Sequence, residues 1–376
     1  MNRSFLWRRW LPVARFFVAL ATITALAPAS RAAMKDGRYL YVVCPGIRDY
    51  LEFGGAGILV YDIDHEHQLV KRIETPASRE EKPDNIKGVC ACAATQRLYF
   101  TTRSKLYCVD LASEKTLWET APPNGTDRMS VTPDGKTIYV PSFEKDTWNV
   151  IDAATGNLVT SIETKSGAHN TVVSRDGGRM YLGGLKSPIL FVADAKTHQI
   201  VDRVGPFAGA IRPFTVNGKR TRAYICVNDC LGFEIGDLTT SKKLHRVDVQ
   251  GVEKGAVKRH GCPSHGIGLT PDEKEIWVVD AFNQKVHVFD NTAEPPKQRE
   301  SIAVREEPGW ITFSLDGKLA WPSTGEVIDT ATKKIITALA DEKGGPVLSE
   351  KMVEIQWRSG EPVAVGDQFG VGRVVK

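Results

Sequence analysis

The sequence repeats a pattern in which a short apolar run ends in an aspartate. The pattern occurs seven times in the 376-residue chain, and successive aspartates are separated by 48, 42, 42, 43, 53 and 39 residues. The seven aspartates are Asp62, Asp110, Asp152, Asp194, Asp237, Asp290 and Asp329. A period of about 40 residues is typical of architectures in which each repeat is one supersecondary unit. The chain is therefore expected to fold as an array of equivalent units.

One of these repeats is particularly easy to divide into strands. Four short segments with strand-like composition follow one another at Met129–Val131, Thr137–Val140, Asn149–Ile151 and Asn157–Ile162. Four-stranded units that recur about every 40 residues are the blades of a β-propeller, in which the sheets surround a central channel. We therefore predict an all-β fold over residues 34–376, a single seven-bladed β-propeller with four-stranded antiparallel blades.

The turns and the repeated aspartates have a structural explanation. The turn Thr132-Pro133-Asp134-Gly135 supplies a glycine for a position with positive φ. The copy at Thr270–Glu273 lacks this glycine, so we expect a turn of another type there. An aspartate at a strand end accepts hydrogen bonds from the backbone that follows it, and Thr stands three residues after four of the seven. We therefore expect the seven aspartates to stabilise turns.

The first 33 residues are organised like a secretory signal peptide. Arginines come first, an apolar stretch runs from Phe16 to Ala27, and small residues that suit cleavage follow at 27–29 and 30–32. This stretch is too short to cross a bilayer, so no transmembrane segment is expected. We predict that residues 1–33 are removed and that the protein is periplasmic or secreted.

Charge and cysteine content exclude several classes of function. The first 33 residues hold five of the 49 basic residues and no acidic residue, which leaves 44 basic against 45 acidic residues in the remaining chain. Nucleic acid is therefore not an expected partner. The seven cysteines form no C-x-x-C or C-x-x-C-H motif, so neither covalent haem nor a paired-motif zinc site is expected.

The two ends of the predicted propeller complete one blade. The N-terminal repeat begins at Arg38–Val42, which matches a second strand, so its inner strand has to come from elsewhere. Lys351–Ile355 has the alternation of an inner strand and follows the last full blade. We predict that this segment closes the ring, because closure removes the exposed sheet edge. The tail at Glu361–Lys376 is also strand-like, and the repeat pattern gives it no position.

The repeat resembles a known family. The stretch Val131–Val140, VTPDGKTIYV, followed by Val150–Gly156, VIDAATG, resembles the YVTN family of seven-bladed β-propellers. That family is similar in fold to bacterial lactonase propellers and to the haem-binding propeller of bacterial nitrite reductase. The resemblance covers nearly all of the chain after residue 33. It implies a fold rather than a function, because such propellers bind, scaffold and catalyse.

The residues that precede the predicted inner strands form a candidate site. One comes from each blade: Lys87, Asp127, His169, Arg212, His265, Trp310 and Lys351. Because inner strands start at the same mouth of the channel, these side chains are expected to converge there. Three neighbours join them: Arg128, Asn170 and, from the insertion at residues 251–264, His260. Imidazoles, cations, a carboxylate and an indole favour binding of a small anionic molecule over a structural lining.

The first functional hypothesis is catalysis on a sugar acid or a lactone. Arg212 would hold a carboxylate while His265 or His169 moves a proton, because the unperturbed histidine pKa lies near neutrality. These three are the predicted catalytic residues. A variant places a divalent metal between His169 and His265, with Asp127 or Glu354 as a further ligand.

The second hypothesis is a non-catalytic exported propeller that binds a small anion, a carbohydrate or a partner protein. A haem or quinone site is a weaker third hypothesis, because the sequence contains no attachment motif. A structural lining would instead have the ring residues bond to one another and to channel water.

Overall fold

The computed structural model describes residue 1, residues 34–258 and residues 260–375. The described residues from 34 onward form one compact unit. Nearly all of the predicted signal peptide, residues 2–33, lies outside the described residues, as does Arg259. In the part of the chain that is described, no helix has the length and hydropathy needed to cross a membrane. Helical structure in the described residues is limited to a single 3-10 turn, η1 (Ala77–Arg79).

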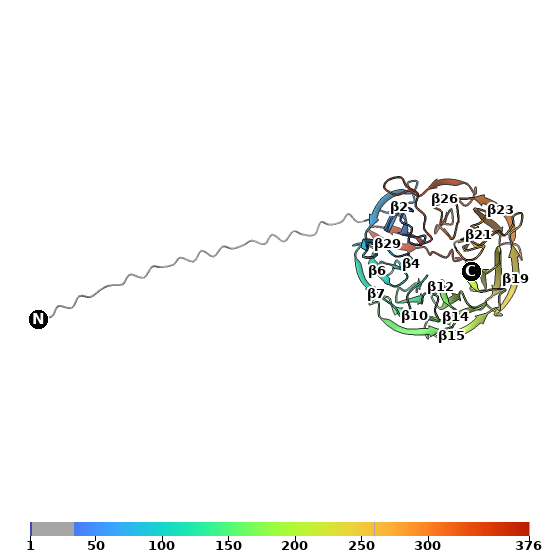
Figure 1. Cartoon of the computed structure of the whole chain (residues 1–376), viewed down its shortest axis with the longest axis horizontal. Coiled ribbons are helices and arrows are strands. Elements are labelled where there is room, and N and C mark those ends of the chain that lie inside the picture. Colours follow the sequence, from blue (N-terminus) through green and yellow to red (C-terminus); the bar gives the residue numbers. More distant parts are fainter. Residues whose placement is uncertain (2–33, 259, 376) are drawn as a thin grey trace. The chain divides into compact units, whose positions relative to one another are not determined.

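Seven antiparallel sheets surround a central channel, as Figure 1 shows. Six of them are four-stranded blades of consecutive strands. Three are β4 (Gly88–Cys92), β5 (Arg97–Thr101), β6 (Leu106–Asp110) and β7 (Thr116–Thr120); β8 (Ser130–Val131), β9 (Thr137–Pro141), β10 (Thr147–Asp152) and β11 (Leu158–Glu163); and β12 (Ala168–Val173), β13 (Arg179–Gly184), β14 (Leu190–Asp194) and β15 (Ile200–Val204). The others are β16 (Ile211–Val216), β17 (Arg222–Val227), β18 (Gly232–Asp237) and β19 (Lys242–Asp248); β20 (Ile267–Leu269), β21 (Glu275–Asp280), β22 (Lys285–Asp290) and β23 (Lys297–Ala303); and β24 (Ile311–Phe313), β25 (Leu319–Pro322), β26 (Glu326–Asp329) and β27 (Ile335–Ala338). The predicted seven-bladed all-β fold is confirmed.

The seventh sheet joins the two ends of the chain. It contains β1 (Gly37–Cys44), β2 (Gly57–Asp62), β3 (Gln68–Ile73), β28 (Met352–Arg358) and β29 (Glu361–Val365), in the order β29-β28-β1-β2-β3. β28 pairs with β1, with Tyr41 opposite Val353, so the predicted closure is confirmed. The tail that the repeat pattern left without a position adds β29 as a fifth strand, which makes this blade larger than predicted.

After β29 the chain crosses the channel. Gly370 accepts hydrogen bonds at its carbonyl from the Leu269 amide (2.8 Å) and the Thr215 hydroxyl (2.7 Å), which belong to two other blades. The buried side chains of Phe369 and Val371 pack in the core cluster that contains Trp310. The described part of the tail therefore lies against the inner strands of these blades, inside the ring of sheets in Figure 1, and ties the blades together.

The core lies between neighbouring blades. One cluster joins Val60 and Val353 of the closing blade to Val89 and Phe100 of the next blade. The alternation of side chains along each strand explains this arrangement, because each sheet presents one apolar face to the blade on either side.

The repeated aspartates stabilise turns as predicted. Asp152 Oδ1 accepts hydrogen bonds from the Thr155 amide (2.8 Å) and hydroxyl (2.7 Å), and Asp329 binds Thr332 in the same way. The other five also accept backbone amides through their side chains. These hydrogen bonds stabilise the carboxylate, and they lower the pKa of Asp152.

The turn at Thr270–Glu273 is not of another type, and that prediction was wrong. Glu273 has a φ of 62°, close to the 69° of Gly135 in the glycine-containing copy. Both turns also close with the same 2.8 Å backbone hydrogen bond. Left-handed φ strains a residue with a side chain. Here Glu273 Oε1 accepts amide hydrogen bonds from Gly218 (2.8 Å) and Val374 (2.9 Å), which compensate for the strain.

Candidate functional site

Residues near the starts of the inner strands line a pocket of about 300 Å³ at one end of the channel. Seven of the ten predicted site residues line it: Lys87, Arg128, His169, Arg212, His260, His265 and Lys351. The other three, Asp127, Asn170 and Trp310, are buried and do not line it. The register of the inner strands therefore brings side chains from several blades together.

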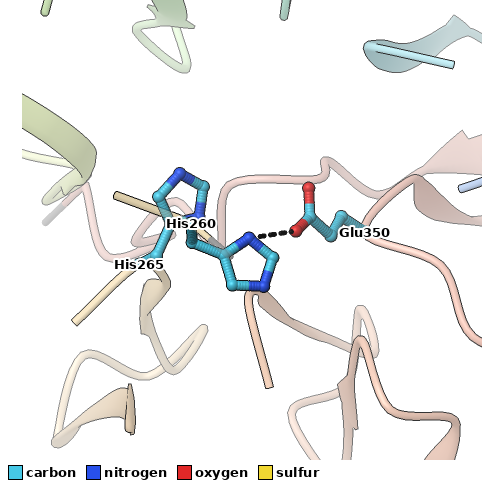
Figure 2. Close-up of side chains that lie close together, drawn as sticks. All are labelled: His260, His265 and Glu350. Atoms are coloured by element: carbon cyan, nitrogen blue, oxygen red, sulfur yellow. Dashed lines mark ion pairs between the residues drawn. The ribbon is translucent and has the colours of Figure 1, made fainter. Parts of the chain in front are cut away.

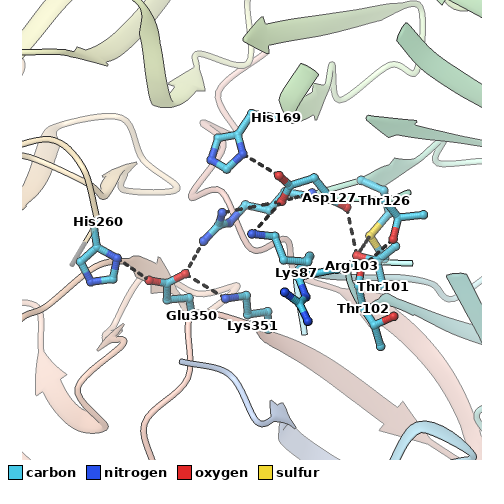
Figure 3. A network of polar contacts seen from close by, with 12 residues as sticks. Lys87, Thr101, Thr102, Arg103, Thr126, Asp127, His169, His260, Glu350 and Lys351 are labelled. Atoms are coloured by element: carbon cyan, nitrogen blue, oxygen red, sulfur yellow. Dashed lines mark hydrogen bonds and ion pairs between the residues drawn. The ribbon is translucent and has the colours of Figure 1, made fainter. Parts of the chain in front are cut away.

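His169 is held by Asp127 (Figure 3). His169 Nδ1 lies 2.6 Å from Asp127 Oδ2, and both side chains are buried. Because the carboxylate accepts, Nδ1 carries the hydrogen and Nε2 keeps its lone pair. Nε2 is buried and, among the described residues, has no hydrogen-bond partner. Burial lowers the pKa of His169 although Asp127 opposes this, so the imidazole is neutral near pH 7.

Asp127 remains ionised although it is fully buried. Burial alone would raise the pKa of its carboxyl group, but His169, Lys87 and Arg128 lower the pKa to about 2. Lys87 Nζ lies 3.5 Å from Asp127 Oδ1. The carboxylate also accepts a hydrogen bond from the Arg128 amide at 3.0 Å. The orientation of His169 therefore depends on a carboxylate that keeps its charge at neutral pH.

Glu350 is a second buried carboxylate, and the sequence analysis missed it. Its Oε2 accepts hydrogen bonds from Arg128 Nη2 and from Lys351 Nζ (2.9 Å), while Oε1 lies 3.1 Å from His260 Nδ1. Figure 3 shows His260 and Lys351 on either side of the carboxylate. Glu350 stands directly before Lys351 in the sequence. That adjacency to a predicted ring position was the available signal.

Lys351 is buried and carries an unusual amine. Its Nζ donates to the Gly46 carbonyl (2.9 Å) as well as to Glu350. Burial, with Arg128 and Lys87 nearby and Glu350 opposing, lowers the pKa of Lys351 to about 7. The pocket therefore contains an amine whose charge changes near neutral pH.

His260 and His265 stack on each other (Figure 2). Their ring centroids are 4.8 Å apart and the planes are inclined by 22°. Together with Glu350 they offer ligand atoms that all lie within 4.8 Å of one another. The lone pairs of an imidazole nitrogen lie in the plane of the ring. Because the two rings are stacked, the lone pairs of His260 and His265 point along nearly parallel planes and do not converge on one point. One ring would have to turn before both could bind one ion.

His265 also faces His169. The two ring centroids are 6.4 Å apart, and His265 Nδ1 donates to the Gly309 carbonyl at 3.1 Å. This bond fixes the hydrogen on Nδ1 and leaves a lone pair on Nε2. Burial and the neighbouring His260 hold the pKa of His265 well below its usual value. Both imidazoles are therefore neutral near pH 7 and keep a lone pair on Nε2.

Arg212 is oriented by two hydrogen bonds on another side of the pocket. Its Nε donates to Asn228 Oδ1 (2.5 Å) and its Nη2 to the Gly261 carbonyl (3.1 Å). Gly261 approaches closely enough that a Cβ there would meet the guanidinium at 3.4 Å. Nη1 has no hydrogen-bond partner in the described part of the chain.

Trp310 lies below the pocket. Arg128 lies over its indole ring, with Cζ 4.3 Å from the ring centroid, and the indole Nε1 donates to the Gln368 carbonyl in the tail. Asn170 is also buried, and neither its amide nitrogen nor its oxygen has a hydrogen-bond partner among the described residues. Trp310 and Asn170 are therefore buried beside residues of the pocket and do not line it.

The lining of the pocket is mixed in charge. Its basic side chains are Arg48, Lys87, Arg103, Arg128, Arg212 and Lys351, and its carboxylates are Asp49, Asp84, Glu144 and Glu350. The basic side chains outnumber the carboxylates, and an excess of charge of one sign in a cleft concentrates ligands of the other sign. Glu354, predicted as a further metal ligand, does not line the pocket: its carboxylate accepts the Leu315 amide and bonds to Gln356.

Comparisons with known proteins identify the fold and no family. No protein-family model matches, and no curated protein matches in sequence. Among solved structures, hydrazine synthase of Kuenenia stuttgartiensis aligns over 73% of this chain and 89% of its own, with a TM-score of 0.60 and 15% identity. The dihydro-heme d1 dehydrogenase NirN in complex with DHE aligns over 91% and 76%, with a TM-score of 0.61 and 15% identity. The chain shares their propeller fold.

Proposed function

We propose that the axial pocket binds a small anionic molecule and that the protein acts on it as a lyase or hydrolase, with a sugar acid or a lactone as substrate class. His169 carries this proposal. Its Nδ1 is held by Asp127, while its Nε2 is buried without a partner in the described residues. An unpaired buried polar atom costs free energy. Such an atom at a pocket is expected to meet a ligand.

The state of His169 suits a general base. The imidazole is neutral, since burial lowers its pKa, and the Nε2 lone pair is free to accept a proton. Asp127 stabilises the imidazolium that forms, because its carboxylate keeps its charge. A positioned acid or base of this kind contributes about 10²- to 10⁴-fold to a rate.

The surrounding cations suit a carboxylate substrate. Arg212 and Lys87 line the pocket and can pair with an anion that enters it. In a lyase, His169 would take the proton on the carbon next to the carboxylate, and a leaving group would depart from the adjacent carbon. In a hydrolase, His169 would take a proton from water, the hydroxide oxygen would bond to the lactone carbonyl carbon, and the ring oxygen would leave and take up a proton.

A test uses the full chain with galacturonate and glucono-1,5-lactone as probes. Anion binding is measured by the rise in melting temperature that galacturonate causes, compared with the rise caused by galactose, which lacks the carboxylate. Lactone hydrolysis is followed by acid release, and elimination by the absorbance of a conjugated alkene. We expect His169→Gln to abolish turnover while binding of galacturonate persists. The matched control His245→Gln, on the outer strand β19, should retain activity. Full activity of His169→Gln would overturn the catalytic assignment.

Binding of a divalent metal ion is a second candidate function. The hydrogen-bond acceptors at Nδ1 of His169 and His265 favour it. In His169 and His265 the Nδ1 hydrogen is donated to an oxygen acceptor, the arrangement that orients metal-ligating histidines. Their Nε2 atoms would hold the ion, which would polarise a carboxylate or carbonyl oxygen. Elemental analysis of protein purified without chelators tests this. Stoichiometric metal that is lost in His265→Ala would support it.

Ligand binding without catalysis is the alternative function. NirN, which shares the fold, is in complex with DHE, which supports ligand binding as a function open to such propellers. In that case the pocket would hold a small anion or a carbohydrate, or its rim would contact a protein. Binding of the anionic probe without turnover of any sugar acid or lactone would favour this alternative.

Export and membership of the YVTN family remain part of the proposal. Both rest on sequence, the first on residues 1–33 and the second on the repeat unit around residues 131–156. The N-terminal sequence of the protein recovered from the periplasm or the medium tests the first. A start between residues 30 and 34 is expected, and an intact Met1 would contradict export by cleavage.

A further inference from the structure

A second cavity, called the groove below, lies at the other end of the channel. It has a volume of about 600 Å³, and its lining includes the ends of inner strands and the turns that follow them, at Cys92–Ala94, Thr132–Pro133 and Ser174–Arg175. The axial pocket is lined from the starts of the inner strands, so the two cavities open at opposite ends. The tail and Trp310 lie between them, joined by the indole hydrogen bond to Gln368. This groove takes no part in the chemistry proposed above.

The walls of the groove are mostly apolar. Val89 and Ala91 of β4 line it from the second blade, Val131 from the third, and Val365 and Phe369 from the C-terminal segment. A surface of this kind gains about 25 cal/mol for each Å² of apolar area that a ligand covers. The groove has room for a drug-sized or lipid-sized chain, since ligand sites usually measure 300–1,000 Å³.

Two arginines give the groove a polar edge. Arg373 pairs with Asp367, with Nη2 3.4 Å from Oδ2. Arg175 has no hydrogen bond or ion pair within residues 34–258 and 260–375. Arg175 and Arg373 both interact with the carboxylate of Asp367, the acidic side chain in the lining of the groove. Two guanidinium groups therefore share one carboxylate, and this edge carries one positive charge in excess.

The geometry points to this groove as a binding site for an amphipathic monocarboxylate, with the alkyl chain along Ala91, Val173 and Val365 and the carboxylate at Arg175. A single uncompensated guanidinium matches a single negative charge. Its fork of N–H donors fits a carboxylate in bidentate fashion. The apolar walls supply affinity, and the arginine selects the sign of the head group.

The test measures binding of octanoate, decanoate and dodecanoate to the full chain by calorimetry, below the micelle concentration of each. We expect saturable binding of one molecule and an affinity that rises about fourfold for each added methylene, since each buried CH₂ contributes about 0.8 kcal/mol. Dodecyltrimethylammonium, which has the same chain and the opposite charge, should bind at least tenfold more weakly. Equal binding of the two, or no saturation with dodecanoate, would overturn the proposal.

Variants separate this groove from the axial pocket. Arg175→Gln should lower the affinity for dodecanoate about tenfold and should not lower the affinity for dodecyltrimethylammonium. Arg175 is exposed and unpaired, so the fold should tolerate the change. The matched control Lys136→Gln alters an exposed cation near the corresponding turn of the neighbouring blade, outside the groove, and should change nothing. Arg212→Ala should also leave dodecanoate binding intact. Wild-type affinity in Arg175→Gln would contradict the proposed head-group site.

Discussion

His169 donates its Nδ1 hydrogen to Asp127 across 2.6 Å, and no side chain of the described residues bonds to the nitrogen on the other side of the ring. A structural histidine in a buried network normally has both nitrogens satisfied. His287 on β22 shows that pattern, because its nitrogens lie 2.8 Å from Ser301 Oγ and 3.2 Å from Asp280 Oδ2. The difference between these two buried histidines is the reason for assigning function to His169.

Asp127→Asn should separate the charge of this carboxylate from its shape. The amide can still accept from His169, but Lys87 and Arg128 lose a buried counterion. We expect a loss of about 3 kcal/mol in the free energy of unfolding. The pKa of His169 should fall further, since Asp127 now raises it. Urea denaturation measures the first and an NMR titration of the imidazole the second. An unchanged imidazole pKa would contradict the coupling.

Arg212→Ala should weaken the binding of an anionic ligand without lowering the stability of the fold. The guanidinium bonds to Asn228 and Gly261 at the pocket, and it is only partly buried. Loss of a charge-assisted hydrogen bond to galacturonate should cost about 1.5–3 kcal/mol of binding free energy. Calorimetry at low salt measures this, with Arg299→Ala on the outer strand β23 as the control. A large fall in melting temperature with unchanged binding would make Arg212 a structural residue.

The blades were predictable because their signals are local. Strand alternation, the turn at Thr132–Gly135 and the capping aspartates all lie within a few residues of the structure they specify. The closing strand β28 was found by counting, since one inner strand was missing. The turn at Glu273 was misread because its left-handed φ is compensated by Gly218 and Val374, which are distant in sequence.

The site was predictable only in outline. The starts of the inner strands have a common register, which is why Lys87, His169 and His265 could be grouped without a structure. Sequence could not show which of the grouped side chains reach the cavity, because that depends on contacts between blades. Glu350 was missed for the same reason: its partners Arg128 and His260 are 222 and 90 residues away in the chain.

The amine of Lys351 should make stability depend on pH in a defined direction. Its pKa is 10.5 as a free side chain and about 7 in the folded protein. Between these values the unfolded chain binds more protons, so the contribution of this group to stability rises as pH increases. Below about pH 7 the amine is charged in both states and the contribution is constant.

Lys351→Met removes this titration. The free energy of unfolding of the wild type should therefore rise relative to the variant from pH 7 to pH 10, with the difference measured by urea denaturation at each pH. Buried tyrosines and cysteines have raised pKa values, so they lower the stability as pH increases. Both proteins contain them, so this effect cancels when the two are compared. Parallel pH profiles would show that the pKa of Lys351 is not lowered.

Two truncations should separate the closing strand from the tail that crosses the channel. Deleting residues 346–376 removes β28 and β29, so β1 loses its neighbour and the ring is open; cooperative unfolding should be lost. Deleting only residues 366–376 keeps every strand but removes the buried side chains of Phe369 and Val371. At about 1.5–3 kcal/mol for each side chain, the shorter truncation should cost about 3–6 kcal/mol of stability, and the truncated protein should still unfold in one transition.

The shorter truncation should also abolish dodecanoate binding, because Phe369 and Arg373 line the groove. Calorimetry of both proteins decides the matter, and a longer truncation that melts like the full chain would contradict closure by β28.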